Sequence, residues 1–319
     1  MTSSNSNRRT FVGKSVALAA ALGGLSHSSG QAATSAVPPV SADQFRFCLN
    51  TSTINHREVP VREQIKIAAE AGYDSIEFWV PDVQKFTGAG GKLTELAREI
   101  ADRGLLVDSA IAFGNWIVDD EAKRKAALEQ CRRDMEIVRE LGGSRIAAPP
   151  SGATREAGLD LRAAANRYRD LLEVGKSVGV VPQLELWGFS KNVSTLEEVL
   201  YIAAGAQHPE ACILLDVYHM YKGGSDFSNV DLVPANKMHC LHMNDYPDMP
   251  RDKITDADRV YPGDGVAPMQ KILKTLVANG FAGAFSLELF NKEYWKRPPA
   301  EVAATGLAKM KAAVSAAFA

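Results

Sequence analysis

Four short apolar runs of this chain end in side chains that can bind a metal ion or move a proton. These side chains are Glu185, Asp216, His242 and Glu288. Burying a lone carboxylate in an apolar strand costs several kcal/mol unless the carboxylate is paired or bound to a cation. Three such carboxylates and one imidazole therefore favour a single divalent metal site over separate structural salt bridges.

The chemistry that such a site supports is proton transfer next to a ketone. A divalent metal that holds a carbonyl and the neighbouring hydroxyl acidifies the C–H between them and stabilises an enediolate. One carboxylate removes the proton, and the same or another carboxylate returns it. Return to the adjacent carbon is isomerisation, return to the opposite face is epimerisation, and loss of a β substituent is elimination. The residue types leave these three outcomes open.

Short apolar runs alternate with longer amphipathic ones from residue 44 to the C-terminus. Strands are predicted at 45–50, 75–79, 105–112, 145–148, 180–186, 212–216, 238–243 and 284–289. Helices are predicted at 61–71, 92–103, 120–141, 161–178, 195–204, 268–279 and 299–318, with a weaker one at 226–233. This alternation predicts a single (β/α)₈ TIM barrel over residues 44–319. An open doubly wound sheet fits less well, because residues 50–53 are not the glycine-rich turn that follows an early strand in that fold.

The catalytic groups of such barrels lie at the C-terminal ends of the strands, where the four candidate ligands fall. His219 follows Asp216 by three residues, so we expect it beside the metal as a further catalytic residue. The polar loop after His242 contains Arg259 and ends in the turn 262–265. Loops of this length inside a compact domain are usually functional, so Arg259 is predicted to hold a substrate oxygen.

Aromatic side chains near the ends of the third and fifth strands are predicted to bind the substrate. Phe113, Trp116 and Trp187 could stack on the apolar face of a six-membered ring. The sequence has no glycine-rich turn or basic cluster for a phosphate. A small unphosphorylated substrate is therefore expected.

These motifs resemble the xylose-isomerase-like sugar phosphate isomerase/epimerase superfamily, and within it the 2-keto-myo-inositol (inosose) isomerases. The resemblance runs from Phe45 to the C-terminus and is most specific in 256–265 and 286–294. It implies that the four candidate ligands bind one divalent metal, and that Glu185 and Glu288 form the acid/base pair. The donor set suits Mn²⁺ or Zn²⁺ best, with Co²⁺ or Mg²⁺ as alternatives.

The resemblance also implies a substrate class, a cyclic keto-polyol such as a keto-inositol or keto-sugar. β-Elimination of a 3-keto-glycoside and 3-epimerisation of a ketose remain as alternatives. Ketose epimerases of this superfamily carry an acidic residue shortly after the first glutamate. Residues 187–191 of this chain, Trp-Gly-Phe-Ser-Lys, contain none, which disfavours a ketohexose.

Two other classes of protein fit the sequence less well. Apurinic endonucleases of the same fold use a multinuclear, histidine-rich zinc site, whereas this chain has only 6 histidines and a formal charge of −2, so no nucleic-acid partner is expected. A non-catalytic sugar-binding protein would not need two glutamates facing each other at the metal. A homo-oligomer is compatible with the sequence.

The first 33 residues differ in composition from the rest. Residues 7–14, Asn-Arg-Arg-Thr-Phe-Val-Gly-Lys, precede an alanine-rich apolar run and Gln31-Ala32-Ala33. This pattern predicts a twin-arginine signal peptide at 1–33 and a linker at 34–43. The apolar run is short for a membrane anchor, so we expect export of the folded chain by the twin-arginine machinery to the periplasm. The four cysteines fit no disulfide framework and are predicted to be buried thiols.

Overall fold

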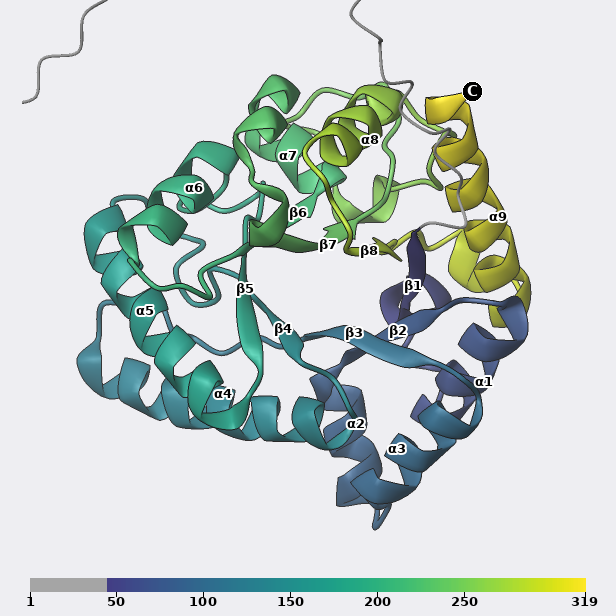
Figure 1. Ribbon diagram of the computed structural model, residues 1–319, viewed down its shortest axis with the longest axis horizontal. Coiled ribbons are helices and arrows are strands. Elements are labelled where there is room, and N and C mark those ends of the chain that lie inside the picture. Colours follow the sequence, from purple (N-terminus) through teal and green to yellow (C-terminus); the bar gives the residue numbers. More distant parts are fainter. Residues whose placement is uncertain (1–44) are drawn as a thin grey trace, which may run out of the picture. The chain divides into compact units, whose positions relative to one another are not determined.

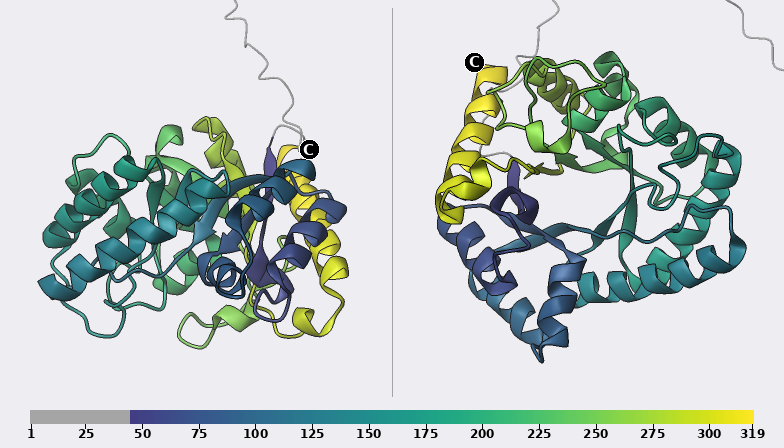
Figure 2. Two further views of the ribbon diagram at one scale, coloured as in Figure 1. Left: turned by 90° about the horizontal axis from the view of Figure 1, so that it is seen from below. Right: turned by 180° about the vertical axis from the view of Figure 1, so that it is seen from behind.

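The computed structural model describes residues 45–319, so the predicted signal peptide and linker lie outside the described residues. The described chain forms a barrel of eight strands surrounded by helices (Figure 1). The strand order is β3-β2-β1-β8-β7-β6-β5-β4, and neighbouring strands in this order pair in parallel. Two further views show the helices as an outer layer around the strands (Figure 2). The predicted TIM barrel is confirmed.

All eight predicted strands are present, each within two residues of its predicted ends. They are β1 (Arg46–Asn50), β2 (Ser75–Trp79), β3 (Leu106–Ile111), β4 (Arg145–Ala148), β5 (Val181–Glu185), β6 (Ile213–Asp216), β7 (Met238–His242) and β8 (Ala284–Leu287). Parallel strands covered on both faces read as continuous apolar runs, which is why the sequence locates them well.

The seven strongly periodic helices are also confirmed, and two more helices are present. The α-helices of residues 45–319 are α1 (Val61–Ala71), α2 (Val80–Gly88), α3 (Leu93–Asp102), α4 (Glu121–Glu140), α5 (Leu161–Val178), α6 (Leu196–Gly205), α7 (Val217–Gly223), α8 (Met269–Ala278) and α9 (Pro299–Phe318). Helices α2 and α7 were not predicted, because each begins directly where a strand ends, without a polar turn between them. The weak helix at 226–233 is a 3₁₀ helix, Phe227–Leu232.

Shorter 3₁₀ helices lie in the connections, at Thr51–Ile54, Ala235–Lys237, Asp256–Asp258 and Tyr294–Lys296. Local signals set the ends of the long helices. Asp160 accepts hydrogen bonds from the first-turn backbone N–H groups of Arg162 and Ala163. Gly179 ends the same helix with a φ of 83°, a conformation that glycine adopts without strain.

The side chains of each strand alternate between two environments. Those facing outward pack against the helices and form the large apolar core. Those facing inward include a smaller apolar cluster of Trp79, Ile111, Ala147, Leu214 and Cys240. The inward positions toward the C-terminal strand ends are largely polar and carry the candidate site. All four cysteines are buried and free, as predicted. None of the described helices is long and apolar enough to cross a membrane.

Candidate metal centre and active site

The structure brings the four predicted ligands together at the C-terminal ends of β5, β6, β7 and β8. His242 Nδ1 lies 3.5 Å from Glu185 Oε1, 3.6 Å from Asp216 Oδ2 and 3.1 Å from Glu288 Oε2. All four residues are buried. Their metal-binding role stays a prediction, but the grouping on which it depends is present.

The ring nitrogen at the centre of this group lacks a hydrogen-bond partner. Within residues 45–319, nothing forms an aligned hydrogen bond with His242 Nδ1. Glu185, His242 and Glu288 offer ligand atoms that all lie within 4.8 Å of one another. A buried imidazole nitrogen that faces carboxylate oxygens without bonding to them fits a divalent cation with mixed nitrogen and oxygen ligands.

The surroundings shift the pKa values of two buried carboxyls, Glu185 and Asp216, in opposite directions. Burial, with smaller contributions from the nearby Glu288 and Asp216 carboxylates, raises the pKa of the Glu185 carboxyl to about 7 against the opposing effect of His242. Burial also disfavours ionised Asp216, but the positive charge of Arg259 outweighs it and holds the pKa of that carboxyl well below its usual range. Glu185 can therefore carry a proton near neutral pH beside a permanently ionised neighbour.

His242 is the positive counterpart of these carboxylates. Burial lowers the pKa of its imidazole, yet Glu288 and Glu77 outweigh burial and raise that pKa well above its usual value. The groups around the ring therefore favour a positive charge at this position.

Arg259 lies at the centre of the buried polar network rather than at its edge. Nη1 donates to Asp216 Oδ2 and to Glu288 Oε2, each at 2.8 Å, and Nη2 lies 3.1 Å from His219 Nε2. The guanidinium stacks near the rings of Tyr218 and Phe290, at 4.4 and 5.0 Å from their centroids. Arg259 therefore balances the charge of two candidate ligands and also lines the cavity next to them.

His219 is buried beside Asp216, as predicted. Its backbone N–H donates to Asp216 Oδ1 at 2.7 Å, so the carboxylate caps α7 as well as facing the site. Burial and the Arg259 charge lower the pKa of the His219 imidazole despite the opposing effect of Asp216. The ring is therefore neutral at pH 7.

A single aspartate holds the loop that carries Arg259. Asp245 Oδ1 accepts from the backbone N–H groups of Tyr246 and Ala267, and Oδ2 accepts from those of Gly263 and Gly265. A Cβ at Gly265 would lie 2.2 Å from the carbonyl oxygen of Tyr246, so only glycine fits this close approach. The turn predicted at 262–265 is thus a tightly bonded support for Arg259.

A cavity of about 180 Å³ opens onto the candidate metal centre. Its lining residues are Trp79, Ile111, Phe113, Glu185, Trp187, Phe189, His219, Asp256, Arg259, Glu288 and Phe290. The predicted Phe113 and Trp187 are among them, with ring centroids 6.0 Å apart. The aromatic side chains of Trp79, Phe189 and Phe290 were not predicted. The first of these lies at a strand end, where an inward aromatic could have been anticipated.

Trp116 does not line this cavity, and its predicted contact with the substrate is corrected. The side chain is only 1% exposed, donates from Nε1 to the Pro149 carbonyl and packs on Tyr168 with a centroid distance of 5.8 Å. The connection after β3 turns toward α5 before it reaches α4, so Trp116 belongs to the core.

Glu77 is a site residue that the sequence analysis missed. It lies at the centre of β2 and is completely buried, with Oε2 3.1 Å from His242 Nε2. A signal was present, because Glu77 shares the alternation of Ser75 and Trp79 in an otherwise apolar run. Asn244, just after β7, was also missed; it donates to Asp216 Oδ2 at 2.9 Å.

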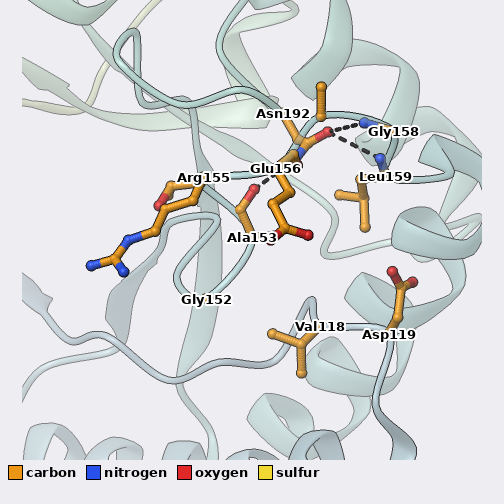
Figure 3. A pocket seen from close by; sticks show the side chains of 11 residues that line it. Val118, Asp119, Gly152, Ala153, Arg155, Glu156, Gly158, Leu159 and Asn192 are labelled. Carbon is orange, nitrogen blue, oxygen red and sulfur yellow. Dashed lines mark hydrogen bonds between the residues drawn. The ribbon is translucent and has the colours of Figure 1, made fainter.

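A larger cavity of about 650 Å³ lies over the connections after β3, β4 and β5 (Figure 3). Asn192 holds the loop at residues 152–159 that lines this cavity. Its side chain accepts from the backbone N–H groups of Gly158 and Leu159 and donates to the carbonyls of Ala153 and Glu156. None of the candidate ligands lines it. The smaller cavity is therefore the one with converging catalytic groups.

With this geometry, comparison with known proteins identifies the class. Residues 65–313 match the model of the xylose isomerase-like TIM barrel family, and the chain belongs to that family. The predicted class of enzyme, a sugar isomerase or epimerase of this type, is confirmed at that level.

Individual relatives add detail. The chain is 28% identical to an inosose isomerase of Halalkalibacterium halodurans, over 79% of this chain and 90% of that protein. It is 25% identical to a 3-dehydroshikimate dehydratase of Pseudomonas putida, over 77% of this chain and 38% of that protein. The crystal structure of the IOLI protein with a bound zinc atom superposes with a TM-score of 0.78 at 24% identity, covering 86% of this chain and 99% of the other.

Proposed function

We propose that this protein is a metal-dependent isomerase or epimerase that moves a proton next to the ketone of a cyclic keto-polyol. The observation that carries the proposal is the buried His242 Nδ1, which faces Glu185, Asp216 and Glu288 without a hydrogen bond. Two of those carboxylates, Glu185 and Glu288, also line the adjoining cavity. The inosose isomerase relatives support the same chemistry.

Glu185, Asp216, His242 and Glu288 would hold one divalent metal. Mn²⁺ or Zn²⁺ suits this donor set best, with Co²⁺ and Mg²⁺ as alternatives, and the zinc atom in the IOLI structure agrees with this choice. A bound metal supplies Lewis-acid polarisation of a substrate carbonyl and its neighbouring hydroxyl.

The protein's own side chains then divide the proton transfers. Glu185 and Glu288 both reach the cavity, and one removes the proton from the carbon next to the ketone while the other returns it. The raised pKa of Glu185, about 7, suits a group that exchanges a proton near neutral pH. Arg259 and the neutral His219 lie in the same wall and hold substrate oxygens as charge develops.

The cavity wall favours a six-membered ring without a phosphate. Trp79 and Phe113 lie with ring centroids 5.1 Å apart, and Trp79 and Phe290 are 5.9 Å apart, so flat apolar faces meet around a space of about 180 Å³. Among the described residues that line this space, Arg259 is the only arginine or lysine, and it is already bound to two carboxylates. A keto-inositol or a monocyclic keto-sugar fits this environment.

Elimination is the second candidate. The Pseudomonas putida relative is named a dehydratase, and dehydration removes a group from the position β to a ketone. The same proton abstraction in this chain, applied to a 3-keto-glycoside, would expel the aglycone. The twin-arginine pattern at residues 7–14 favours a substrate met in the periplasm, where exported oxidoreductases could supply 3-keto-glycosides or keto-inositols.

Product analysis tests this proposal. The protein is stripped of metal with a chelator, reloaded with Mn²⁺ or Zn²⁺, and offered keto-inositols, 3-keto-glycosides, fructose and tagatose. We expect metal-dependent turnover of a cyclic ketone, and the product separates isomerisation, epimerisation and elimination. Turnover of fructose or tagatose with none of any cyclic ketone would overturn the proposed substrate class.

A further inference from the structure

We propose that Glu77 is a positioning residue for the metal centre, which fixes His242 so that Nδ1 is its metal-binding nitrogen. Nothing in the sequence analysis assigned a role to this side chain. This role rests on the proposed metal site. In it, Glu77 orients the candidate ligand His242 and does not bind the metal itself.

Three hydrogen-bond donors converge on one oxygen of Glu77. Oε2 lies 2.7 Å from Ser286 Oγ, 2.9 Å from Asn50 Nδ2 and 3.1 Å from His242 Nε2. The Asn50 amide nitrogen can only donate, and the amide is oriented by the Trp79 indole N–H, which donates to Asn50 Oδ1. Glu77 Oε2 is therefore a hydrogen-bond acceptor.

An acceptor at Nε2 determines which ring nitrogen remains for a metal. Because Glu77 Oε2 already accepts from Asn50, it also accepts from His242 Nε2, which therefore carries the hydrogen. Nδ1 is then the nitrogen that can offer a lone pair, and it is the one that faces the three candidate carboxylate ligands. Metal-binding histidines generally donate their second N–H to a carboxylate or carbonyl in this way.

The same oxygen is linked to a second candidate ligand. Asn50 Nδ2 also lies 3.2 Å from Glu288 Oε1, and its Oδ1 accepts from Trp79 Nε1 at 3.0 Å. The indole N–H thus fixes the orientation of the amide. Glu77 therefore supports His242 directly and Glu288 through Asn50.

A different role for Glu77 would be that of a ligand itself. Glu77, Cys240 and His242 also form a compact group of possible ligands. That arrangement would use His242 Nε2 and a thiolate, yet Cys240 lies in the inner apolar cluster with Leu214 and Ala147. Three donors already occupy Glu77 Oε2. The geometry therefore favours a supporting role.

The test compares two substitutions of Glu77, one that keeps a hydrogen-bond acceptor for His242 Nε2 and one that removes it. Glu77→Gln keeps the volume and one acceptor oxygen, while Glu77→Met removes the acceptor and the charge. Asp108→Asn is the matched control, because Asp108 is another buried strand carboxylate, paired with Arg46 away from the candidate ligands. For each protein the Zn²⁺ affinity is measured by competition with a chelator, and the stability of the metal-free form by denaturant unfolding.

We expect the Glu77→Met substitution to weaken Zn²⁺ binding about 10–100-fold, with Glu77→Gln near the lower end of that range. In the zinc-loaded wild type, ¹⁵N-histidine NMR should show a slowly exchanging Nε2–H on His242, and Glu77→Met should lose that protection. Asp108→Asn should lower stability without changing affinity. If Glu77→Met does not fold, wild-type affinity in Glu77→Gln overturns the inference.

The outcomes separate this inference from the proposed function. No zinc binding by the wild type would overturn the metal site, and the inference with it. Wild-type affinity and a protected Nε2–H in Glu77→Met would overturn only the role of Glu77. A thiolate-to-cobalt charge-transfer band in the Co²⁺-loaded protein that disappears in Cys240→Ser would show that the alternative ligand group is the real one.

Discussion

Individual residues of the same type have different roles in this site because their partners differ. Glu288 accepts hydrogen bonds from Asn50 Nδ2 at 3.2 Å and from Arg259 Nη1 at 2.8 Å. Glu185 has different surroundings, because burial and the nearby carboxylates of Glu288 and Asp216 raise its pKa to about 7 against the opposing effect of His242. Two glutamates in unlike surroundings are what a paired proton transfer requires.

Loss of the carboxylate of Glu185 or of Glu288 should stop proton transfer next to the ketone. We expect Glu185→Gln and Glu288→Gln each to abolish solvent proton exchange into a bound ketone while the circular dichroism spectrum is unchanged. Glu156→Gln, in the wall of the larger cavity, is the control and should keep full activity. Near-normal exchange in one of the two glutamine variants would show that this glutamate only binds the metal.

His219 should contribute less than the two glutamates. We expect His219→Ala to lower the turnover number on the order of 10²-fold, as for the loss of one group that stabilises developing charge. Steady-state kinetics with a cyclic ketone measures this. An unchanged turnover number would place His219 outside the catalytic group.

At this scale the sequence predicted the grouping of the four candidate ligands, whose metal binding stays a prediction, and missed the residues that support them. Glu185, Asp216 and His242 end their strands, and Glu288 directly follows one, which marks them in an apolar run. Glu77 lies mid-strand, and its proposed role depends on His242, which is 165 residues away in sequence. Trp116 was assigned to the site by its distance from a strand end, but the path of the connection decides where such a side chain points.

At the scale of elements, apolar patterning located every strand and the long helices. It missed α2 and α7, where the apolar Val80 and the run Val217–Tyr218 continue a strand pattern into the first helical turn. Asp216 illustrates the reason. It ends β6, caps α7 by accepting from the His219 N–H, and faces the site, so one residue serves two elements.

The loop between β7 and α8 provides a test of how an element positions a residue. Asp245→Ala removes the acceptor for four backbone N–H groups, and each buried group left unpaired costs about 1–3 kcal/mol. We expect a lower free energy of unfolding, faster amide hydrogen exchange at Gly263 and Gly265, and lower activity through a displaced Arg259. Asp245→Asn, which keeps one carboxamide oxygen, should lie between the wild type and Asp245→Ala. Unchanged exchange at both glycines in Asp245→Ala would contradict this account.

At the scale of the whole molecule, the barrel unites residues that are far apart in sequence. Pairing of β1 with β8 brings Asn50 beside Glu288, and pairing of β6, β7 and β8 aligns Asp216, His242 and Ser286 in adjacent strands. The strand alternation predicted this architecture. The side-chain contacts across the barrel depend on register, which a single sequence does not reveal.

Export is a property of the whole chain, and we propose the twin-arginine route from residues 7–14. Replacing the arginine pair, Arg8→Lys with Arg9→Lys, should leave uncleaved precursor in the cytoplasm. Fractionation with an antibody against the folded protein measures the distribution. Normal export and cleavage of this double variant would rule out the proposed route.

The central claim is that this site moves protons next to a ketone. Its most direct test is NMR of a cyclic keto-inositol in D₂O with the metal-loaded wild-type protein. We predict that the signal of the hydrogen on the carbon beside the ketone disappears as deuterium enters, and that chelation of the metal stops the exchange. Stoichiometric metal binding without any deuterium incorporation into a cyclic ketone would contradict the account.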